Sequence, residues 1–72
     1  MRNFEFTMAL SEPKTRAIYA GQARYILVET DQGLKLQMPA ANFLDFVTAE
    51  GIQGRFRVRI DDNNKILTLQ RA

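Results

Sequence analysis

Two stretches in which apolar and mostly polar residues alternate constrain the fold of this chain more than any other feature of its sequence. In the first, every second residue from Phe4 to Leu10 is Phe, Met or Leu. In the second, three arginines alternate with three apolar residues, in the order Arg55, Phe56, Arg57, Val58, Arg59 and Ile60. A repeat of two residues indicates a β-strand with one buried face. Both stretches are therefore expected to be strands.

A short helix is expected after the first strand. Ser11 is a good helix N-cap, and Pro13 fits the first turn of a helix, where its missing N–H group would have no partner. Gly21 can end the helix in the left-handed conformation. The sequence therefore predicts a helix over residues 12–20.

The middle of the chain is expected to form a hairpin. Residues 22–30 are apolar on both faces of a strand, which is typical of a central strand that is covered on both sides. Asp31–Gly33 has turn-forming chemistry, and residues 34–38 alternate as a third strand. The expected register places Glu29 opposite Lys35, which is a favourable cross-strand pair of charges.

A second short helix and a final hairpin follow. Apolar residues at helical spacing after Pro39 predict a helix over residues 40–46. Residues 61–64, Asp-Asp-Asn-Asn, favour a turn that returns the chain along the arginine strand. The final strand then places only uncharged residues opposite the arginines: Ile66, Thr68 and Gln70.

The order of elements predicts a single α+β domain over residues 1–72: strand, helix, strand, strand, helix, strand, strand. Five short strands with a doubly covered central strand favour a bent five-stranded antiparallel sheet or a partly open small barrel, with two short helices. A domain of this size gains only about 3–5 kcal/mol of net stability from its core. Self-association, as in a homodimer, is one way to add to that stability.

The residue types present exclude several kinds of chemistry. The chain has no Cys and no His, so disulfides, the usual zinc sites, a thiolate nucleophile and an imidazole base are excluded. Residues 61–64 are rich in oxygen ligands, but Ile66 and Ala72 stand where a calcium loop needs Gly and Glu. We therefore expect no metal, no cofactor and no enzymatic activity.

Neither an export signal nor a membrane span is expected. No apolar run is longer than that of Tyr25–Val28, which is far shorter than the roughly 20 residues that cross a bilayer. The N-terminal stretch alternates and so lacks the continuous apolar region of a signal peptide. The sequence thus predicts a cytoplasmic protein without a membrane partner.

One segment carries a family resemblance. The motif Phe46-Val47-Thr48, followed by Gly51-Ile52-x-Gly54-x-Phe56, resembles a small proteobacterial family of stand-alone proteins of about this length, catalogued as a domain of unknown function. The resemblance extends over nearly the whole chain through further matching positions: Leu10-Ser11, Tyr19-x-Gly21-x-Ala23, Pro39-Ala40, Asp61 and Leu69-x-Arg71. Asp45 departs from the pattern, because relatives are expected to have proline there. The resemblance implies a cytoplasmic bacterial protein and supplies no catalytic residue.

The arginine strand is the first candidate site. Arg55, Arg57 and Arg59 project on one side at intervals of about 6.8 Å, which roughly matches the phosphate spacing of an extended single strand. Arg24 and Tyr25 are candidates to add a cation and a ring on which a base can stack. These five residues predict contact with single-stranded nucleic acid or with an acidic protein. The structural alternative is an ordinary solvent-facing side of a strand.

The second candidate is the short helix that contains Phe43 and Phe46. An exposed pair of phenylalanines would bind a partner or a second subunit, whereas a buried pair would belong to the core. The leading hypothesis for the whole chain is a small binding module that contacts single-stranded nucleic acid. The alternative is a protein-interaction module or homodimer with no nucleic-acid role.

Overall fold

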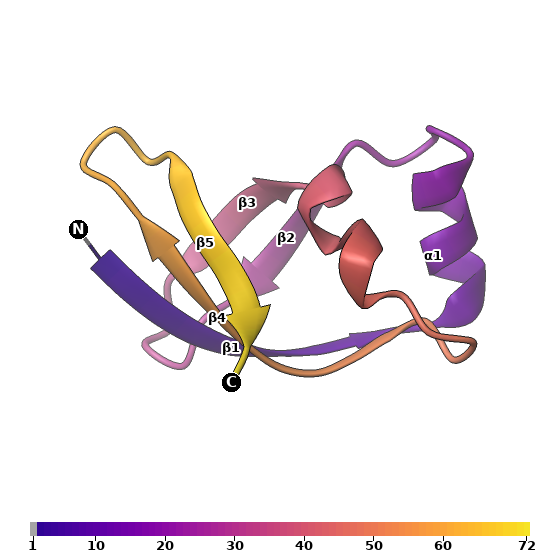
Figure 1. The fold of residues 1–72 in the computed structure, drawn as a ribbon, viewed down its shortest axis with the longest axis horizontal. Coiled ribbons are helices and arrows are strands. Elements are labelled where there is room, and N and C mark those ends of the chain that lie inside the picture. The colour runs from indigo at the N-terminus through magenta and orange to yellow at the C-terminus, as the bar shows by residue number, and fades with distance from the viewer. Residues whose placement is uncertain (1) are drawn as a thin grey trace.

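The computed structural model describes residues 2–72, which form five strands, one α-helix and one 3-10 helix. The α+β class is confirmed, and each expected helix or strand overlaps an observed one. Neither described helix has the length and apolar character needed to cross a membrane. Along the chain (Figure 1) the elements are β1 (Arg2–Leu10), α1 (Glu12–Tyr19), β2 (Tyr25–Glu29), β3 (Lys35–Pro39), η1 (Ala40–Phe46), β4 (Ile52–Ile60) and β5 (Ile66–Arg71).

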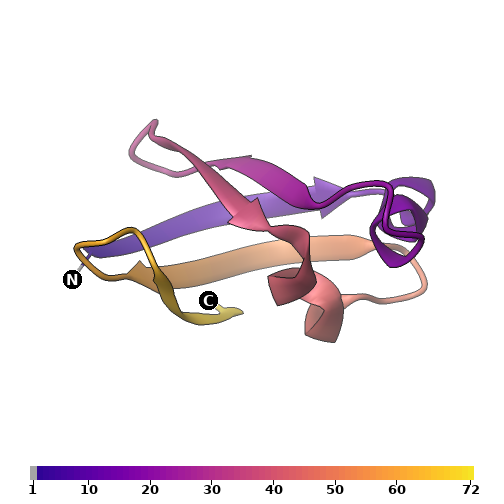
Figure 2. The same ribbon diagram turned by 90° about the horizontal axis from the view of Figure 1, so that it is seen from above.

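The described strands form two antiparallel sheets and not the single bent five-stranded sheet that the sequence led us to expect, and they do not close into a barrel. One sheet has the order β1-β4-β5, and the other is the β2-β3 hairpin. β1 and β4 pair over nine residues each, which places Phe6 opposite Phe56. The two sheets meet at the hairpin turn, where the backbone N–H of Asp31 donates to the carbonyl of Glu5 at 2.8 Å. Figure 2 shows the β2-β3 hairpin lying over one side of the longer sheet.

The expectation that residues 22–30 form a central, doubly covered strand is wrong. Among the described strands, β2 pairs with β3 alone, and β4 is the central strand. Val28 is buried, but the neighbouring Leu27 is 65% exposed and Tyr25 is 60% exposed. β1 and β4 are longer and match apolar faces along their whole length, so they pair with each other and leave the short hairpin outside. The expected register of Glu29 opposite Lys35 is confirmed.

The core is built from aromatic rings of three elements. Phe6 of β1, Phe43 of η1 and Phe56 of β4 are fully buried, and their ring centroids lie 5.9–6.2 Å apart. Phe46 packs edge-on against Phe56 at 5.1 Å. Each ring buries about 150–250 Å². In a chain this short, η1 is therefore positioned chiefly by the two rings that it contributes to the core.

The final hairpin follows the expected register only in part. Arg57 lies opposite Gln70 and Arg59 opposite Thr68, as predicted. Ile66, however, lies opposite Ile60 and not opposite an arginine, because the register shifts between Arg59 and Ile60. An irregularity of this kind changes which face the following side chains occupy.

The glycines of the motif have structural roles. Gly51 adopts φ +102°, and a Cβ built there would lie 2.0 Å from the carbonyl oxygen of Leu10. Gly54 adopts φ +124°, and its Cβ would lie 2.8 Å from Nη1 of Arg71. Only glycine fits at position 51, because the Cβ of any other residue would overlap with backbone atoms. The motif Gly51-Ile52-x-Gly54 therefore describes how β4 packs against its surroundings.

Candidate binding surfaces

The three arginines of β4 share one exposed face of the β1-β4-β5 sheet, as the alternation predicted. Phe56 and Val58 point to the core, so Arg55, Arg57 and Arg59 point away from it. β5 supplies no carboxylate at the paired positions Thr68 and Gln70. This part of the expectation is confirmed, since the described strand on that side carries only uncharged residues there.

Carboxylates reach the arginine face from β1 and from the β2-β3 turn, which the sequence interpretation missed. Glu5 lies opposite Arg57 in the β1-β4 register, and Glu5 Oε2 lies 3.3 Å from Arg57 Nη2. Asp31 binds Arg55 through two parallel contacts, Nη1 to Oδ1 at 3.0 Å and Nη2 to Oδ2 at 2.5 Å. Arg55 also lies 3.4 Å from Glu5 and donates to Thr7 at 3.0 Å. The uncharged residues of β5 are therefore only one side of the surroundings of these arginines, and acids contact Arg55 and Arg57 from elsewhere in the fold.

The two-pronged contact has an electrostatic consequence. The hydrogen bonds from Arg55 lower the pKa of Asp31 below its ordinary value of 3.8, because they stabilise the ionised carboxylate. The same contact raises the pKa of Arg55. Since Asp31 belongs to the hairpin turn and Arg55 to β4, this ion pair connects the two sheets. A phosphate that binds Arg55 must compete with a carboxylate already in place.

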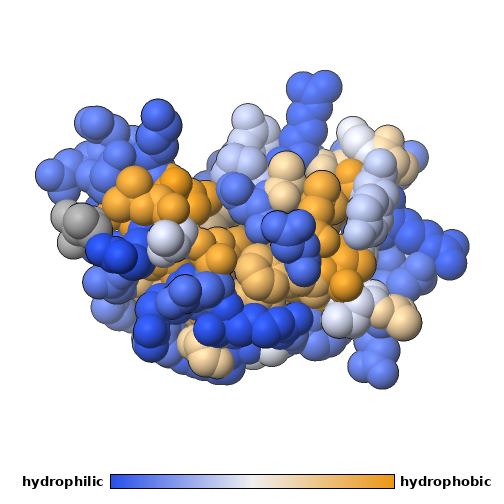
Figure 3. All heavy atoms as spheres, in the orientation of Figure 1, coloured by the Kyte–Doolittle hydropathy of each residue, from blue (hydrophilic) through white to orange (hydrophobic). Residues whose placement is uncertain are grey.

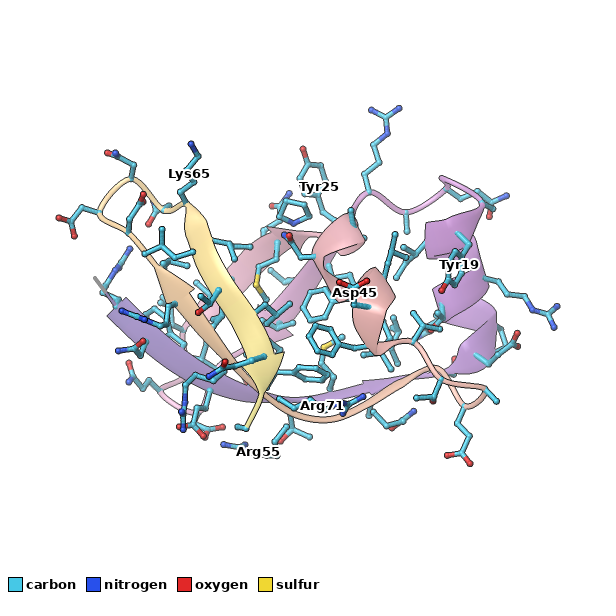
Figure 4. All side chains as sticks on the ribbon, viewed as in Figure 1. Tyr19, Tyr25, Asp45, Arg55, Lys65 and Arg71 are labelled. Atoms are coloured by element: carbon cyan, nitrogen blue, oxygen red, sulfur yellow. The ribbon has the colours of Figure 1, made fainter. Side chains whose placement is uncertain are left out.

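Arg24 and Tyr25 lie on a different part of the surface from the arginine face. Tyr25 begins β2 opposite Pro39, whereas the other end of the hairpin reaches Arg55 through Asp31. Figure 4 shows Tyr25 and Arg55 on opposite sides of the molecule. The chain from Tyr25 to Asp31 spans about 20 Å when extended. The five residues predicted to bind nucleic acid do not form one surface.

The two phenylalanines of η1 do not form an exposed interface. Phe43 is fully buried, which matches the core alternative and leaves no surface of this ring for a partner. Phe46 is half-buried, and the guanidinium of Arg71 lies 5.7 Å from its ring and 5.0 Å from the ring of Phe56. Arg71 Nη1 also donates to the carbonyl of Gln53 at 2.8 Å. Arg71 therefore covers this end of the core by cation–π contacts.

A groove of about 600 Å³ separates β3 from the β4-β5 hairpin, and sequence reasoning did not anticipate it. Residues 34–39 all line the groove, both those whose side chains point inward and those whose side chains point outward. β3 therefore presents the edge of its backbone to the groove. Figure 3 shows hydrophobic surface over the start of β5, next to a notch in the outline of the molecule. The other lining residues are Arg2, Asn42, Ile60, Asn64, Lys65 and Ile66.

The groove has an apolar floor and a basic rim. Its apolar residues come from both sides and include Leu36, Met38, Ile60 and Ile66. Among the described residues that line it, three are cationic and none is acidic: Arg2, Lys35 and Lys65.

Nearby polar groups hold parts of this rim in place. Arg2 donates to the side-chain oxygen of Asn64 at 2.5 Å. Asp61 accepts from the backbone N–H groups of Asn63 and Lys65, at 2.8 and 2.9 Å, and so fixes the turn from which Lys65 projects. Glu29 lies opposite Lys35 on the outer face of the hairpin. The sequence indicated the groove only through two turns, residues 31–33 and 61–64. These turns bring Lys35 and Lys65 to the starts of β3 and β5.

Comparison with known proteins identifies the family of the chain. No curated protein and no solved structure matches it. A family model matches residues 2–72, which is nearly the whole chain and includes the arginine strand and both walls of the groove. The chain therefore belongs to the family described as "Protein of unknown function (DUF2835)".

Proposed function

We propose that this chain is a non-enzymatic protein-interaction module that binds a segment of a partner in the groove between β3 and the β4-β5 hairpin. The observation that carries the proposal is the edge of β3. This strand pairs with β2 alone among the described strands, and its opposite edge lines an apolar groove. Strand edges next to hydrophobic pockets are a recurring mode of peptide recognition.

The composition of the groove supports binding more than catalysis. Its polar side chains are Arg2, Lys35, Gln37, Asn42, Asn64 and Lys65. None of these is a carboxylate or an imidazole that could act as a general base at neutral pH. The volume falls within the range of about 300–1,000 Å³ that is typical of binding pockets.

Selection from a displayed library of random peptides tests this function. We expect selected peptides to shift the backbone amide NMR signals of residues 34–39 and 64–66 in the labelled protein. A Leu36→Lys variant, which places a charge on the half-buried apolar lining of the groove, should lose binding, whereas Lys14→Glu on α1 should keep it. If selected peptides bind only elsewhere, or no peptide binds, the groove is not a docking surface.

Single-stranded nucleic acid is the second candidate ligand, and the observation in its favour is the arginine face. The side chains of Arg55 and Arg57 remain 43% and 45% exposed. This candidate ranks second because Glu5 and Asp31 already accept hydrogen bonds from these arginines. Tyr25, which was expected to stack on a base, also lies on another side of the molecule.

An NMR titration with a mixed-sequence single-stranded oligonucleotide decides between the two candidates. If nucleic acid binds, the amide signals of residues 55–59 shift at low salt and return as salt rises, because phosphate contacts release counterions. Glu5→Gln should then strengthen binding by removing a competing carboxylate. No shift at about 100 µM protein, a concentration that detects the weak end of non-specific binding, removes this candidate.

A further inference from the structure

We infer that the partner segment is an extended, acidic stretch of another protein that adds to the free edge of β3 as a new antiparallel or parallel strand. This inference rests on the function proposed for the groove and specifies the chemistry of its ligand. It follows from three properties of the groove: the direction of the β3 peptide groups, the two faces of β3, and the sign of the charge around the rim.

The peptide groups of β3 that face the groove can be identified from its pairing with β2. The N–H of Thr30 donates to the carbonyl of Leu34, and the N–H of Ala40 donates to the carbonyl of Arg24, both at 2.8 Å. In an antiparallel pair, every second residue directs its polar groups to the partner strand. Residues 34, 36, 38 and 40 therefore bond toward β2. Lys35 and Gln37 direct their N–H and C=O groups the other way, toward the groove.

The two faces of β3 specify an alternating ligand. Leu36 pairs with the buried Val28, so Leu36 and Met38 face inward, toward Ile60 and Ile66 across the groove. Lys35 and Gln37 have the opposite parity and lie on the exposed outer face. A strand added at this edge would therefore place alternate side chains against an apolar floor and against Lys35. Apolar residues that alternate with carboxylates fit both faces.

The charge around the groove favours an acidic partner over a second copy of this chain. Arg2, Lys35 and Lys65 line the groove, and no acidic residue does among the part of the chain described. Glu29 and Asp61 lie near two of these cations but outside the lining. Two copies that met groove to groove would bring like charges together, and the chain carries a net charge of +2. Like-charge contacts of this kind disfavour an interface.

The probe for this inference is a capped nine-residue peptide in which valine alternates with glutamate. Its affinity is measured by NMR titration against the intact chain, together with two comparison peptides. One replaces every glutamate by lysine, and the other carries an N-methyl group on every amide so that neither edge can donate hydrogen bonds. We expect the glutamate peptide to bind in the groove and both comparison peptides to bind at least roughly tenfold more weakly, because each loses charge pairing or ladder hydrogen bonds.

Matched variants locate the interaction on β3 and on the rim. Gln37→Pro removes an N–H that points to the groove and is not needed by β2, and proline is tolerated at a strand edge in that orientation. We expect it to abolish binding. Lys65→Glu should weaken binding about five- to tenfold. Lys14→Glu changes the net charge equally on α1, at the far end of the molecule, and should change affinity by less than about twofold.

Each outcome decides a separate part of the inference. Equal binding of the glutamate and lysine peptides would overturn the acidic partner, and tight binding of the N-methylated peptide would overturn strand addition, even if Gln37→Pro failed to fold. Displacement of the peptide by decanoate at equal concentration would identify a small-anion pocket instead. A doubled mass in solution that Lys65→Glu increases would favour a second copy. If library peptides bind the groove while the glutamate peptide does not, only this inference fails, whereas absence of all peptide binding contradicts the proposed function itself.

Discussion

β4 and β3 both carry cations on exposed surface, but their surroundings differ. β4 lies between β1 and β5, and carboxylates from β1 and from the β2-β3 turn accept hydrogen bonds from its arginines. β3 has one neighbouring strand, and its other edge lines a groove with basic residues and no acidic ones among those described. β4 carries more cations, yet the outer edge of β3 offers more backbone hydrogen-bonding groups with which a partner can still pair. Binding capacity therefore depends on which groups lack partners within the fold and less on the number of cations.

The substitution with the largest expected effect on stability tests whether the β1-β4-β5 sheet is more tightly packed than the β2-β3 hairpin. Gly51→Ala would place a Cβ 2.0 Å from the carbonyl oxygen of Leu10 and should lower the free energy of unfolding by at least about 3 kcal/mol, because backbone must move. Gly33→Ala, in the hairpin turn, has the same kind of positive φ but no atom within 4 Å, and should cost about 1 kcal/mol. Urea unfolding measures both. Equal losses would show that the two regions are equally constrained.

A matched pair of core substitutions tests whether the hairpin opens independently of the sheet. Val58→Ala on β4 and Val28→Ala on β2 each remove two buried methyl groups, and each should cost about 2–3 kcal/mol locally. We expect Val58→Ala to speed amide hydrogen exchange in both sheets. Val28→Ala should speed it mainly over β2 and β3, since the hairpin is joined to β1 through few contacts. Uniform acceleration in both variants would mean that the two sheets unfold together.

The smallest expected effect on stability concerns the ion pair between Asp31 and Arg55. The pKa of Asp31 is lowered in the folded state, so its contribution to stability is present above the unfolded value of 3.8 and is lost as pH falls through the folded pKa. Asp31→Asn should therefore be slightly less stable than the parent at pH 7, and the difference should shrink as pH falls below 3.8 and through the lowered folded pKa. Thermal unfolding across this pH range measures it. Asp45→Asn, on η1, is the control, and a difference that persists at low pH would contradict the assigned pair.

The local parts of the fold could be predicted from the sequence because short turns determine them. The turn at Asp31–Gly33 places Glu29 opposite Lys35, and the chemistry of residues 61–64 returns β5 along β4. The pairing of β1 with β4 joins residues about fifty positions apart, and no turn determines its register. That register brings Glu5 to Arg57, so the error about the arginine face came from a long-range contact.

The candidate site could be predicted only where a single strand determined it. The alternation alone placed three arginines on one face, which is confirmed. It could not show that Tyr25 lies on another side of the molecule or that Phe43 is buried, since both depend on how the hairpin and η1 pack on the longer sheet. The groove depends on how the β2-β3 hairpin packs beside the β4-β5 hairpin. That packing belongs to the assembled topology and is absent from the sequence of any one strand.

The position of Arg2 has a practical consequence for binding experiments. Arg2 lines the groove, so an affinity tag joined ahead of it would begin at the rim and could cover β3 or compete for it. A tag that follows Ala72 would leave the molecule beside Arg55, where the N–H of Ala72 donates to the Arg55 carbonyl at 3.0 Å. Arg2 lies opposite Ile60 and Ala72 lies beside Arg55, so the two positions are at different points along β4. A screen for partners that uses only an N-terminal fusion would therefore tend to hide the very interaction that it seeks.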